Sequence, residues 1–233
     1  MLSDTLAKNQ KTGIILTDII PVPNAVSAHK RREAVHTMGA CGHGIIKAKR
    51  SGIMVYIFLA DGFEEIEGLT VVDLLRRAEI QIRMVSITGS KQVLGSHNIK
   101  VEADELFGEA DYKNADMLIL PGGMPGTKHL AKHQELVTVL KQFNKEGRRI
   151  AAICAAPSVL GLNGILQGKR VTCFPGYEDK LPGAVVTGNK TEADFNIITG
   201  KGMGVSIDFS LRIIETLKDK ETADKIAAAI QYI

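Results

Sequence analysis

After residue 53 the chain alternates short apolar runs with amphipathic stretches, and this alternation restricts the fold more than any other feature. Residues 53–60 form a nearly continuous apolar run, as expected of a strand buried on both faces. Residues 64–78 follow with a helical period, acidic residues in the first turn and Arg76-Arg77 in the last. Such alternation predicts an α/β protein in which helices cover both faces of a mostly parallel sheet.

The same patterns predict the rest of the domain, and three turns that follow strands carry unusual residues. Further strands are expected over residues 80–87, 117–120, 150–154, 170–173, 184–187 and 195–199, and a short strand or hairpin arm is expected over 93–102. Further helices are expected over 126–145, from about 156, 205–217 and 220–230. Sites in parallel sheets lie beyond the carboxyl ends of the strands. There the sequence places residues 61–67, the Pro121-Gly122-Gly123 turn and Cys154, so we expect these segments to meet.

Charge is distributed unevenly and separates an N-terminal extension (residues 1–52) from the α/β domain (residues 53–233). The net charge is +3, yet residues 1–50 hold eight Lys or Arg against three Asp or Glu, and residues 51–233 hold 21 against 23. The domain is therefore slightly acidic, and we expect no nucleic-acid partner. The extension lacks a regular period, and a native start at Met54 would explain it. The spacing of His36, Cys41 and His43 matches no zinc site, so no metal is expected.

The sequence also predicts where the protein acts. No apolar run approaches the roughly 20 residues of a membrane helix, and the N-terminus shows no apolar signal core followed by a cleavage site. The three cysteines cannot form a closed disulfide framework. These features predict a cytoplasmic protein without a membrane partner.

Cys154 is the first candidate for a reactive side chain. It ends a predicted strand directly before a predicted helix, and small residues flank it in Ala152-Ile153-Cys154-Ala155-Ala156. A sharp strand-to-helix turn needs small neighbours, as in a nucleophile elbow. Free N–H groups at a helix N-terminus stabilise an anion, so we expect a lowered pKa for this thiol. The alternative is a buried structural cysteine, which is our interpretation of Cys173.

Glu67 is the second candidate. On the predicted helix it shares a face with Val71, Leu74, Leu75 and Ala78, which should be the buried face. A buried carboxyl has a raised pKa and stays protonated, so it could donate a hydrogen bond to a nearby thiolate. Its neighbours Glu64 and Glu65 are expected to face water.

Backbone groups complete the predicted site. Gly122 and Gly123 allow the backbone to approach a ligand closely, and the N–H groups of Gly123 and Ala155 could bind a developing oxyanion. All six histidines precede Cys154, and the last is His133. A catalytic triad with a histidine after the cysteine is therefore excluded. His129 and His133 are expected on a solvated helix face.

Taken together and in order, several motifs resemble the ThiJ/PfpI superfamily, most closely the branch of the parkinsonism-associated protein, or protein deglycase. They are Gly62-Phe-Glu-Glu-Ile-Glu67, Asp73-Leu-Leu-Arg-Arg-Ala78, Leu120-Pro-Gly-Gly-Met-Pro-Gly126, Ala151-Ala-Ile-Cys-Ala-Ala-Pro157 and Asp208-Phe209. The resemblance covers residues 53–233 and implies a flavodoxin-like three-layer sandwich that forms a homodimer. It implies that Cys154 is an oxidation-sensitive nucleophile held by a protonated Glu67, with Gly123 and Ala155 at the oxyanion hole.

The resemblance also implies an activity without a cofactor. Members of the family are glyoxalases that convert methylglyoxal to lactate, deglycases of early glycation adducts, or redox-responsive chaperones. We therefore expect a small dicarbonyl or a glycated molecule as the substrate. A redox-sensing cysteine protein or chaperone without turnover is the alternative, and a PfpI-type protease is a weaker one.

Two departures from the family pattern bear on the mechanism. Some members carry a histidine near the cysteine, where this chain has Phe174, so a ready general base is missing. Where the branch often has Arg after Ser, this chain has Ser96-His97. His97 is a candidate proton carrier, and the alternative is a histidine on the surface of a hairpin.

Overall fold

The computed structural model describes residues 52–232 of the 233-residue chain. The predicted N-terminal extension, its boundary with the domain, and His36, Cys41 and His43 lie outside the described residues. No helix in residues 52–232 combines the length and apolar character needed to cross a bilayer.

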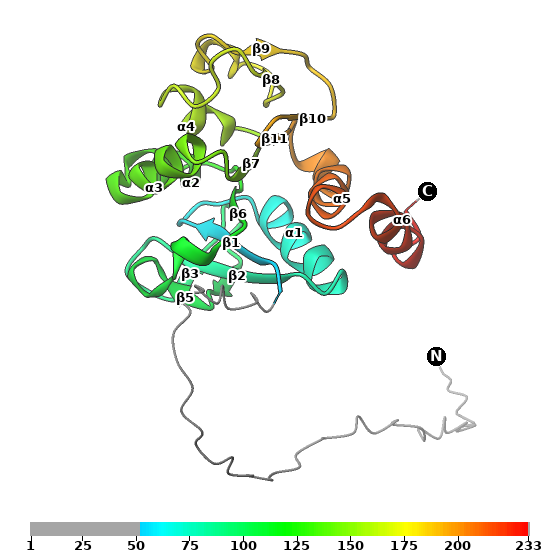
Figure 1. Cartoon of the computed structure of the whole chain (residues 1–233). Helices are drawn as coiled ribbons and strands as arrows, with labels where there is room; N and C mark the ends of the chain where they lie inside the picture. Colours follow the sequence, from blue (N-terminus) through cyan, green and yellow to red (C-terminus); the bar gives the residue numbers. More distant parts are fainter. Residues whose placement is uncertain (1–51, 233) are drawn as a thin grey trace, which may run out of the picture. The chain divides into compact units, whose positions relative to one another are not determined.

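The strands are β1 (Met54–Leu59), β2 (Gln81–Ser86), β3 (Gln92–Leu94), β4 (Lys100–Glu102), β5 (Glu105–Leu106), β6 (Met117–Leu120), β7 (Arg149–Ile153), β8 (Arg170–Val171), β9 (Val185–Val186), β10 (Thr191–Asp194) and β11 (Ile197–Gly200). The α-helices are α1 (Glu65–Arg77), α2 (Gly126–Lys132), α3 (Gln134–Lys145), α4 (Pro157–Gly161), α5 (Ser206–Leu217) and α6 (Lys220–Ala229). Short 3₁₀ turns cover Phe107–Glu109, Tyr112–Asn114, Glu178–Lys180 and Met203–Val205. Strands alternate with helices from β1 to β2 and from β6 to α4, whereas β2 to β6 and β8 to β11 follow one another without an intervening α-helix (Figure 1).

A seven-stranded sheet in the order β10-β11-β7-β6-β1-β2-β5 forms the centre of the fold. Every neighbouring pair is parallel except β10 with β11. Within the described residues, β1 is the first strand, and β2 and β5 follow it toward one edge of the sheet. The chain then returns to β6, which pairs with the other side of β1. Strand order therefore reverses between β1 and β6, where sheets of this kind form their sites beyond the carboxyl ends of the strands.

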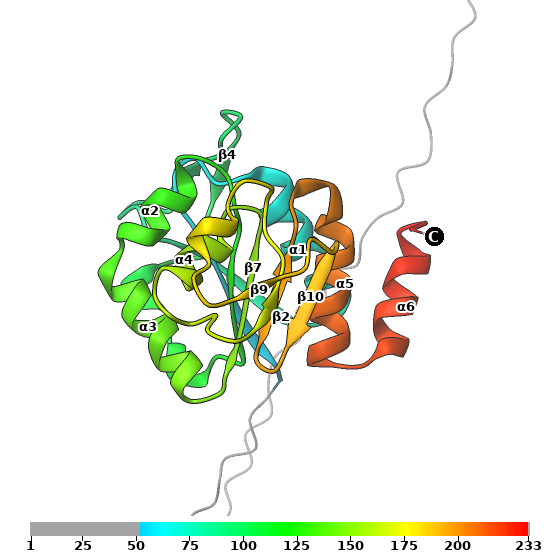
Figure 2. The ribbon, with the colours of Figure 1, turned by 90° about the horizontal axis from the view of Figure 1, so that it is seen from above.

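Helices cover both faces of the sheet, so the molecule has three layers (Figure 2). Alternate residues of β1 enter different cores: Val55 and Ile57 pack with α1 and α5, whereas Tyr56 and Phe58 pack with α2, α3 and α4. This is why residues 53–60 lack the polar alternation of a half-exposed strand. The flavodoxin-like sandwich and the mostly parallel sheet predicted from the sequence are confirmed.

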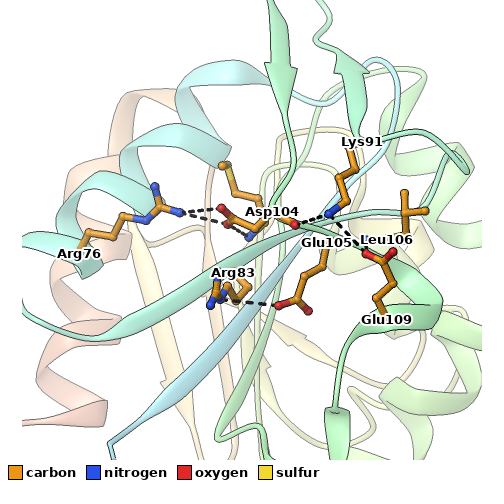
Figure 3. Close-up of polar contacts among 8 residues, drawn as sticks. Arg76, Arg83, Lys91, Asp104, Glu105, Leu106 and Glu109 are labelled. Atoms are coloured by element: carbon orange, nitrogen blue, oxygen red, sulfur yellow. Dashed lines mark hydrogen bonds and ion pairs between the residues drawn. The ribbon is translucent and has the colours of Figure 1, made fainter. Parts of the chain in front are cut away.

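Ionic contacts hold the sheet edge at β5 (Figure 3). Asp104 pairs with Arg76 of α1 at 3.1 Å and accepts the Met84 N–H of β2 at 2.7 Å. Arg83 lies 3.6 Å from Glu105, and Lys91 lies 3.5 Å from Glu109. The strand itself is only two residues long. A short, charged edge offers little template for pairing with another sheet.

Three predicted segments differ from the structure. The helix expected over residues 126–145 is two helices, α2 and α3, because His133 leaves the helical conformation and its Nδ1 accepts the Leu136 N–H at 3.1 Å. The strand expected over 195–199 is present as β11 but begins two residues later, and it pairs with β10, a strand that was not predicted, in a hairpin that turns at Phe195 with φ of 54°. Residues 93–102, expected to form a short strand or one arm of a hairpin, instead supply both strands of the β3–β4 hairpin.

Candidate active site

Cys154 occupies a sharp turn at the carboxyl end of β7. Its φ is 63°, in the left-handed region that residues with a side chain rarely adopt. Its N–H donates to the Gly200 carbonyl of β11 at 2.9 Å, and its carbonyl accepts the Phe174 N–H at 2.8 Å. These two bonds fix the strained residue, and the Cys154 side chain is partly exposed. The structure thus contains the predicted nucleophile elbow.

Glu67 reaches the same place from the first turn of α1. The residue is only 1% exposed, and its Oε2 accepts the Gly122 N–H at 2.9 Å. Within the described chain, Oε1 is buried without a hydrogen-bond partner of regular geometry. The Cys154 thiol interacts with the same carboxyl. The predicted orientation of Glu67 toward the core and toward Cys154 is confirmed.

Burial dominates the titration of Glu67. It raises the pKa of the carboxyl from 4.5 to about 7, with a smaller contribution from the charge of Glu64. Hydrogen bonds from Cys154 and Gly122 act in the opposite direction. The predicted direction of this shift is confirmed, and the value places the carboxyl where it can both give and take a proton at neutral pH.

The prediction of a lowered pKa for Cys154 is wrong. Burial, the charge of Glu67 and the hydrogen bond with Glu67 raise the pKa of the thiol to about 12, whereas the backbone N–H groups of Ala155 and Gly123 lower it only in part. The expected helix effect is weak because α4 has only five residues and begins at Pro157, three residues after the cysteine. The sulfur therefore depends on its immediate neighbours for any stabilisation of a negative charge.

The glycine turn after β6 lies directly beside these two side chains. A Cβ on Gly122 would lie 2.5 Å from Glu67 Oε2 and 2.7 Å from Cys154 Cβ, so only glycine fits there. Gly123 has φ of 94°, and a Cβ on it would lie 2.2 Å from the Glu64 nitrogen. The backbone N–H groups of Gly123 and Ala155 face the Cys154 thiol, and both act to lower its pKa. The structure therefore brings together all five predicted residues, Cys154, Glu67, Gly122, Gly123 and Ala155.

His97 hydrogen-bonds with the carboxylate of Glu65 and not with that of Glu67. Its Nδ1 is 2.9 Å from Glu65 Oε2, its N–H donates to Glu65 Oε1 at 2.7 Å, and its side chain is 67% exposed. This contact, with the charges of Glu64 and Glu65, raises the pKa of His97. Within residues 52–232, the hydrogen bonds and ion pairs of His97 reach Glu64, Glu65 and Ser96 and not Cys154 or Glu67, so its role as a proton carrier stays a prediction.

The expectation that Glu65 faces water is wrong. Glu65 is 4% exposed and receives hydrogen bonds from Ser96 and His97 on the β3–β4 hairpin. Although burial acts to raise its pKa, the bonds from His97 and Ser96 lower it to about 2. The signal for this contact is absent from any local pattern, because the partners lie about 30 residues away.

The remaining histidines and the one metal-like cluster do not extend the site. His129 Nδ1 lies 3.0 Å from the Asp61 carbonyl, and His133 packs on Phe107 at 4.5 Å between ring centroids. The expectation of a merely solvated helix face is thus wrong for His133. Potential ligand atoms of Glu64, Glu65 and His97 lie within 4.8 Å of one another. They already hydrogen-bond with one another or with Ser96, and we assign no metal to them.

The contact of the segment around Gly200 and Gly202 with Cys154 was not predicted from the sequence. Gly200 accepts the Cys154 N–H, and a Cβ on Gly202 would lie 4.0 Å from the sulfur and 3.3 Å from the Phe174 ring. The only local signal is the spacing of glycines in Gly200-Lys-Gly202. The prediction that Cys173 is structural agrees with its burial, since it is 3% exposed.

The fold and the turn at Cys154 define a class: flavodoxin-like α/β proteins with a cysteine at a nucleophile elbow beside a buried glutamic acid. The family model described as "DJ-1/PfpI family" matches residues 54–216. This chain belongs to the DJ-1/PfpI family, as its motifs predicted.

Individual relatives agree with this assignment. The chain is 33% identical over 176 residues to "Protein DJ-1 homolog B" of Arabidopsis thaliana, which covers 75% of this chain but 40% of the plant protein. It is 32% identical over 165 residues to "Glutathione-independent glyoxalase DJR-1.2" of Caenorhabditis elegans, over 70% of this chain and 87% of that protein. The solved structure "Toxoplasma gondii DJ-1, oxidized" superposes with a TM-score of 0.74 and 35% identity, over 78% of this chain and 99% of that one. The chain thus spans less than half the length of the plant relative.

Proposed function

We propose that this protein is a cysteine-dependent glyoxalase that converts methylglyoxal to lactate without a cofactor, or that repairs early glycation adducts by the same chemistry. One observation carries the proposal: a thiol at a strained turn touches a buried carboxyl whose pKa is about 7, with two backbone N–H groups beside the sulfur. The relative from Caenorhabditis elegans, named as a glutathione-independent glyoxalase, supports this assignment.

The first step is addition of Cys154 to the aldehyde. In the pair with one proton removed the charge lies on Glu67, the stronger acid, so the carboxylate takes the thiol proton as sulfur attacks the aldehyde carbon. The S–C bond forms, the carbonyl π electrons move to oxygen, and Glu67 passes the proton on to that oxygen to give a hemithioacetal. The N–H groups of Gly123 and Ala155 are the donors that would stabilise the developing oxyanion.

The second step is proton transfer between the two carbons of the adduct. Ionised Glu67 takes the proton from the former aldehyde carbon, which gives an enediolate, and returns it to the neighbouring carbon. The hydroxyl proton passes from the former aldehyde oxygen to the neighbouring oxygen, and the product is a lactoyl thioester. Water then adds to the thioester carbon and the C–S bond breaks, which releases lactate and the thiol. A carboxyl with a pKa of about 7 suits this exchange, because both protonation states are populated at neutral pH.

The test measures lactate formed from methylglyoxal by the wild type, Cys154→Ala and Glu67→Gln. We expect both variants to lose activity by at least about 100-fold, the size of a general acid–base contribution. Cys173→Ala, which removes a buried cysteine outside the site, should keep wild-type activity. Equal rates in the wild type and Cys154→Ala would contradict the proposal.

A redox sensor is the second candidate, and a specific observation favours it. The three histidines of the described chain all make their contacts elsewhere: His97 with Glu65, His129 with the Asp61 carbonyl and His133 with Leu136 and Phe107. Cys154 thus has no imidazole base at hand, which suits slow oxidation better than rapid turnover. In this case two equivalents of peroxide convert the thiol to a sulfinic acid and yield two water molecules.

Mass spectrometry after mild peroxide treatment separates the two candidates. A sensor predicts a selective gain of two oxygen atoms on the Cys154 peptide, no gain on the Cys173 peptide, and no lactate formation. Glu67→Leu should slow the gain, since the sulfinate loses its hydrogen-bond donor. Turnover of methylglyoxal by the same preparation would decide for the enzyme.

A further inference from the structure

Phe174 is part of the surroundings of the Cys154 sulfur, although it lies 20 positions later in the sequence. Its N–H donates to the Cys154 carbonyl at 2.8 Å, so the backbone of residue 174 is tied to the elbow. The point where a Cβ on Gly202 would lie is 3.3 Å from Phe174 Cδ2 and 4.0 Å from Cys154 Sγ. The ring and the sulfur therefore flank the same glycine.

The Phe174 ring is held in place but not covered. Tyr177 packs edge-on against it, with ring centroids 6.4 Å apart and planes at 81°, and the Tyr177 N–H donates to the Phe174 carbonyl at 3.1 Å. Even so, Phe174 remains 46% exposed, and Met203, which follows Gly202, is 48% exposed. An apolar group that covers this exposed aromatic ring removes apolar surface from water, which stabilises the complex.

We propose that Phe174 forms the wall of an apolar subsite beside Cys154, which accepts a planar apolar substituent carried within one or two bonds of the atom that sulfur attacks. In the context of the proposed function, this substrate class is an aldehyde with an aryl or bulky alkyl group next to its dicarbonyl unit, favoured over methylglyoxal. The inference rests on the proposed function only in taking Cys154 as the attacking group.

A labelling series isolates this contact from turnover. Alkyl methanethiosulfonates react with a thiolate so that a new S–S bond forms, the reagent's S–S bond breaks and methanesulfinate leaves with the electron pair. The thiol proton goes to solvent. The methyl, benzyl and trimethylammonium-ethyl reagents share this chemistry and differ only in their substituent. Rate constants at Cys154, followed by mass spectrometry and divided by those for free cysteine, report the environment of the sulfur.

We expect the benzyl-to-methyl ratio of the wild type to exceed that of free cysteine by about fivefold, the effect of one aromatic contact. Phe174→Ala should abolish this excess, and Phe174→Leu, which keeps the apolar volume without the plane, should retain part of it. Phe195→Ala is the matched control, because Phe195 is 87% exposed and precedes β11, at the opposite end of the sheet. Thermal melting of each variant verifies that it is folded.

An equal ratio in the wild type and in folded Phe174→Ala would overturn the inference. So would a Phe174-dependent preference for the trimethylammonium reagent over the benzyl one, which would indicate a cation–π site. The ratio of kcat/KM for phenylglyoxal to that for methylglyoxal should fall in Phe174→Ala in parallel with the labelling ratio. If neither dicarbonyl is turned over, the proposed glyoxalase function fails, and the labelling ratios still decide whether the subsite exists.

Discussion

At the scale of single residues, the site consists of two acids that share one small volume. Cys154 and Glu67 are both withdrawn from water, and burial raises the pKa of each. Their mutual repulsion opposes the loss of a second proton, so a single negative charge is the form that the surrounding N–H groups have to stabilise. Gly122 allows this proximity, because any side chain there would collide with both partners.

The raised pKa of Glu67 makes stability depend on pH. Folding favours the protonated carboxyl, so its contribution is complete below the unfolded pKa of 4.5 and is lost as pH rises through about 7. Between pH 5 and pH 8 we expect the wild type to lose about 3 kcal/mol of unfolding free energy relative to Glu67→Gln. Urea unfolding at a series of pH values measures this difference. The exposed Glu102→Gln should follow the wild-type curve, and parallel curves for the wild type and Glu67→Gln would contradict the expectation.

Much of this site could be predicted from residue patterns, and the errors have a common physical cause. Cys154, Glu67 and the glycine turn each stand at a strand end or on an apolar helix face, so local periodicity finds them. The direction of the Cys154 pKa could not be found in this way, because it depends on burial and on the charge of Glu67. The burial of Glu65 was missed for the same reason, since Ser96 and His97 cover it from a distant hairpin.

At the scale of elements, the β3–β4 hairpin is fastened to the start of α1. The Gly62 N–H donates to the Leu94 carbonyl at 2.7 Å, and the Ser96 N–H donates to the Phe63 carbonyl at 2.8 Å. The Glu65 carboxylate completes the junction through His97. Because Glu67 lies in the same helical turn as Glu65, the hairpin helps to fix the segment that carries the buried acid.

A methyl group at Gly95 should loosen this junction. A Cβ there would lie 2.2 Å from Glu65 Oε1, so Gly95→Ala displaces the carboxylate from its hydrogen bonds with the hairpin. We expect a loss of about 2 kcal/mol in unfolding free energy, measured by denaturant titration. Gly108→Ala, which meets no atom within 4 Å, serves as the control. Equal stability of both variants would show that the carboxylate moves aside without cost.

Element boundaries were predicted less well than element types. The division between α2 and α3 depends on His133, which serves as a cap through its ring nitrogen, a use that a helical period does not reveal. Strand β10 and its hairpin with β11 were not predicted, because the turn residues between the two strands, Phe195 and Asn196, include an apolar side chain that is almost fully exposed. In contrast, the long runs at β1, α1 and α5 specify their elements by themselves.

At the scale of the whole molecule, the alternation of strands and helices determines the parallel three-layer architecture, and strand order follows only from tertiary packing. The sequence resemblance also implies a homodimer. Three exposed apolar side chains lie on the start of α1 and on the β3–β4 hairpin: Ile66 is 49% exposed, Leu94 39% and Ile99 51%. In Figure 2 the hairpin that includes β4 projects from the body of the domain, so these residues are open to a partner.

Sedimentation velocity tests the homodimer. We expect a mass of about twice the 25.2 kDa of one chain at micromolar concentration. Ile66→Asp should shift the equilibrium toward the monomer, because it would place a charge in the apolar interface. Leu162→Asp alters an equally exposed apolar residue on the other side of the sheet, after α4, and should leave the mass unchanged. A monomeric wild type would contradict the expectation.

The left-handed backbone at Cys154 has a consequence for how such proteins change over time. Glycine would adopt that turn without steric penalty, so selection for thermal robustness alone would drive the position toward glycine. A chain that keeps a cysteine at this turn is less stable than its glycine variant would be, and it keeps a reactive thiol. The residue found at this left-handed turn, cysteine or glycine, therefore separates a reactive homologue from one in which the turn is only structural.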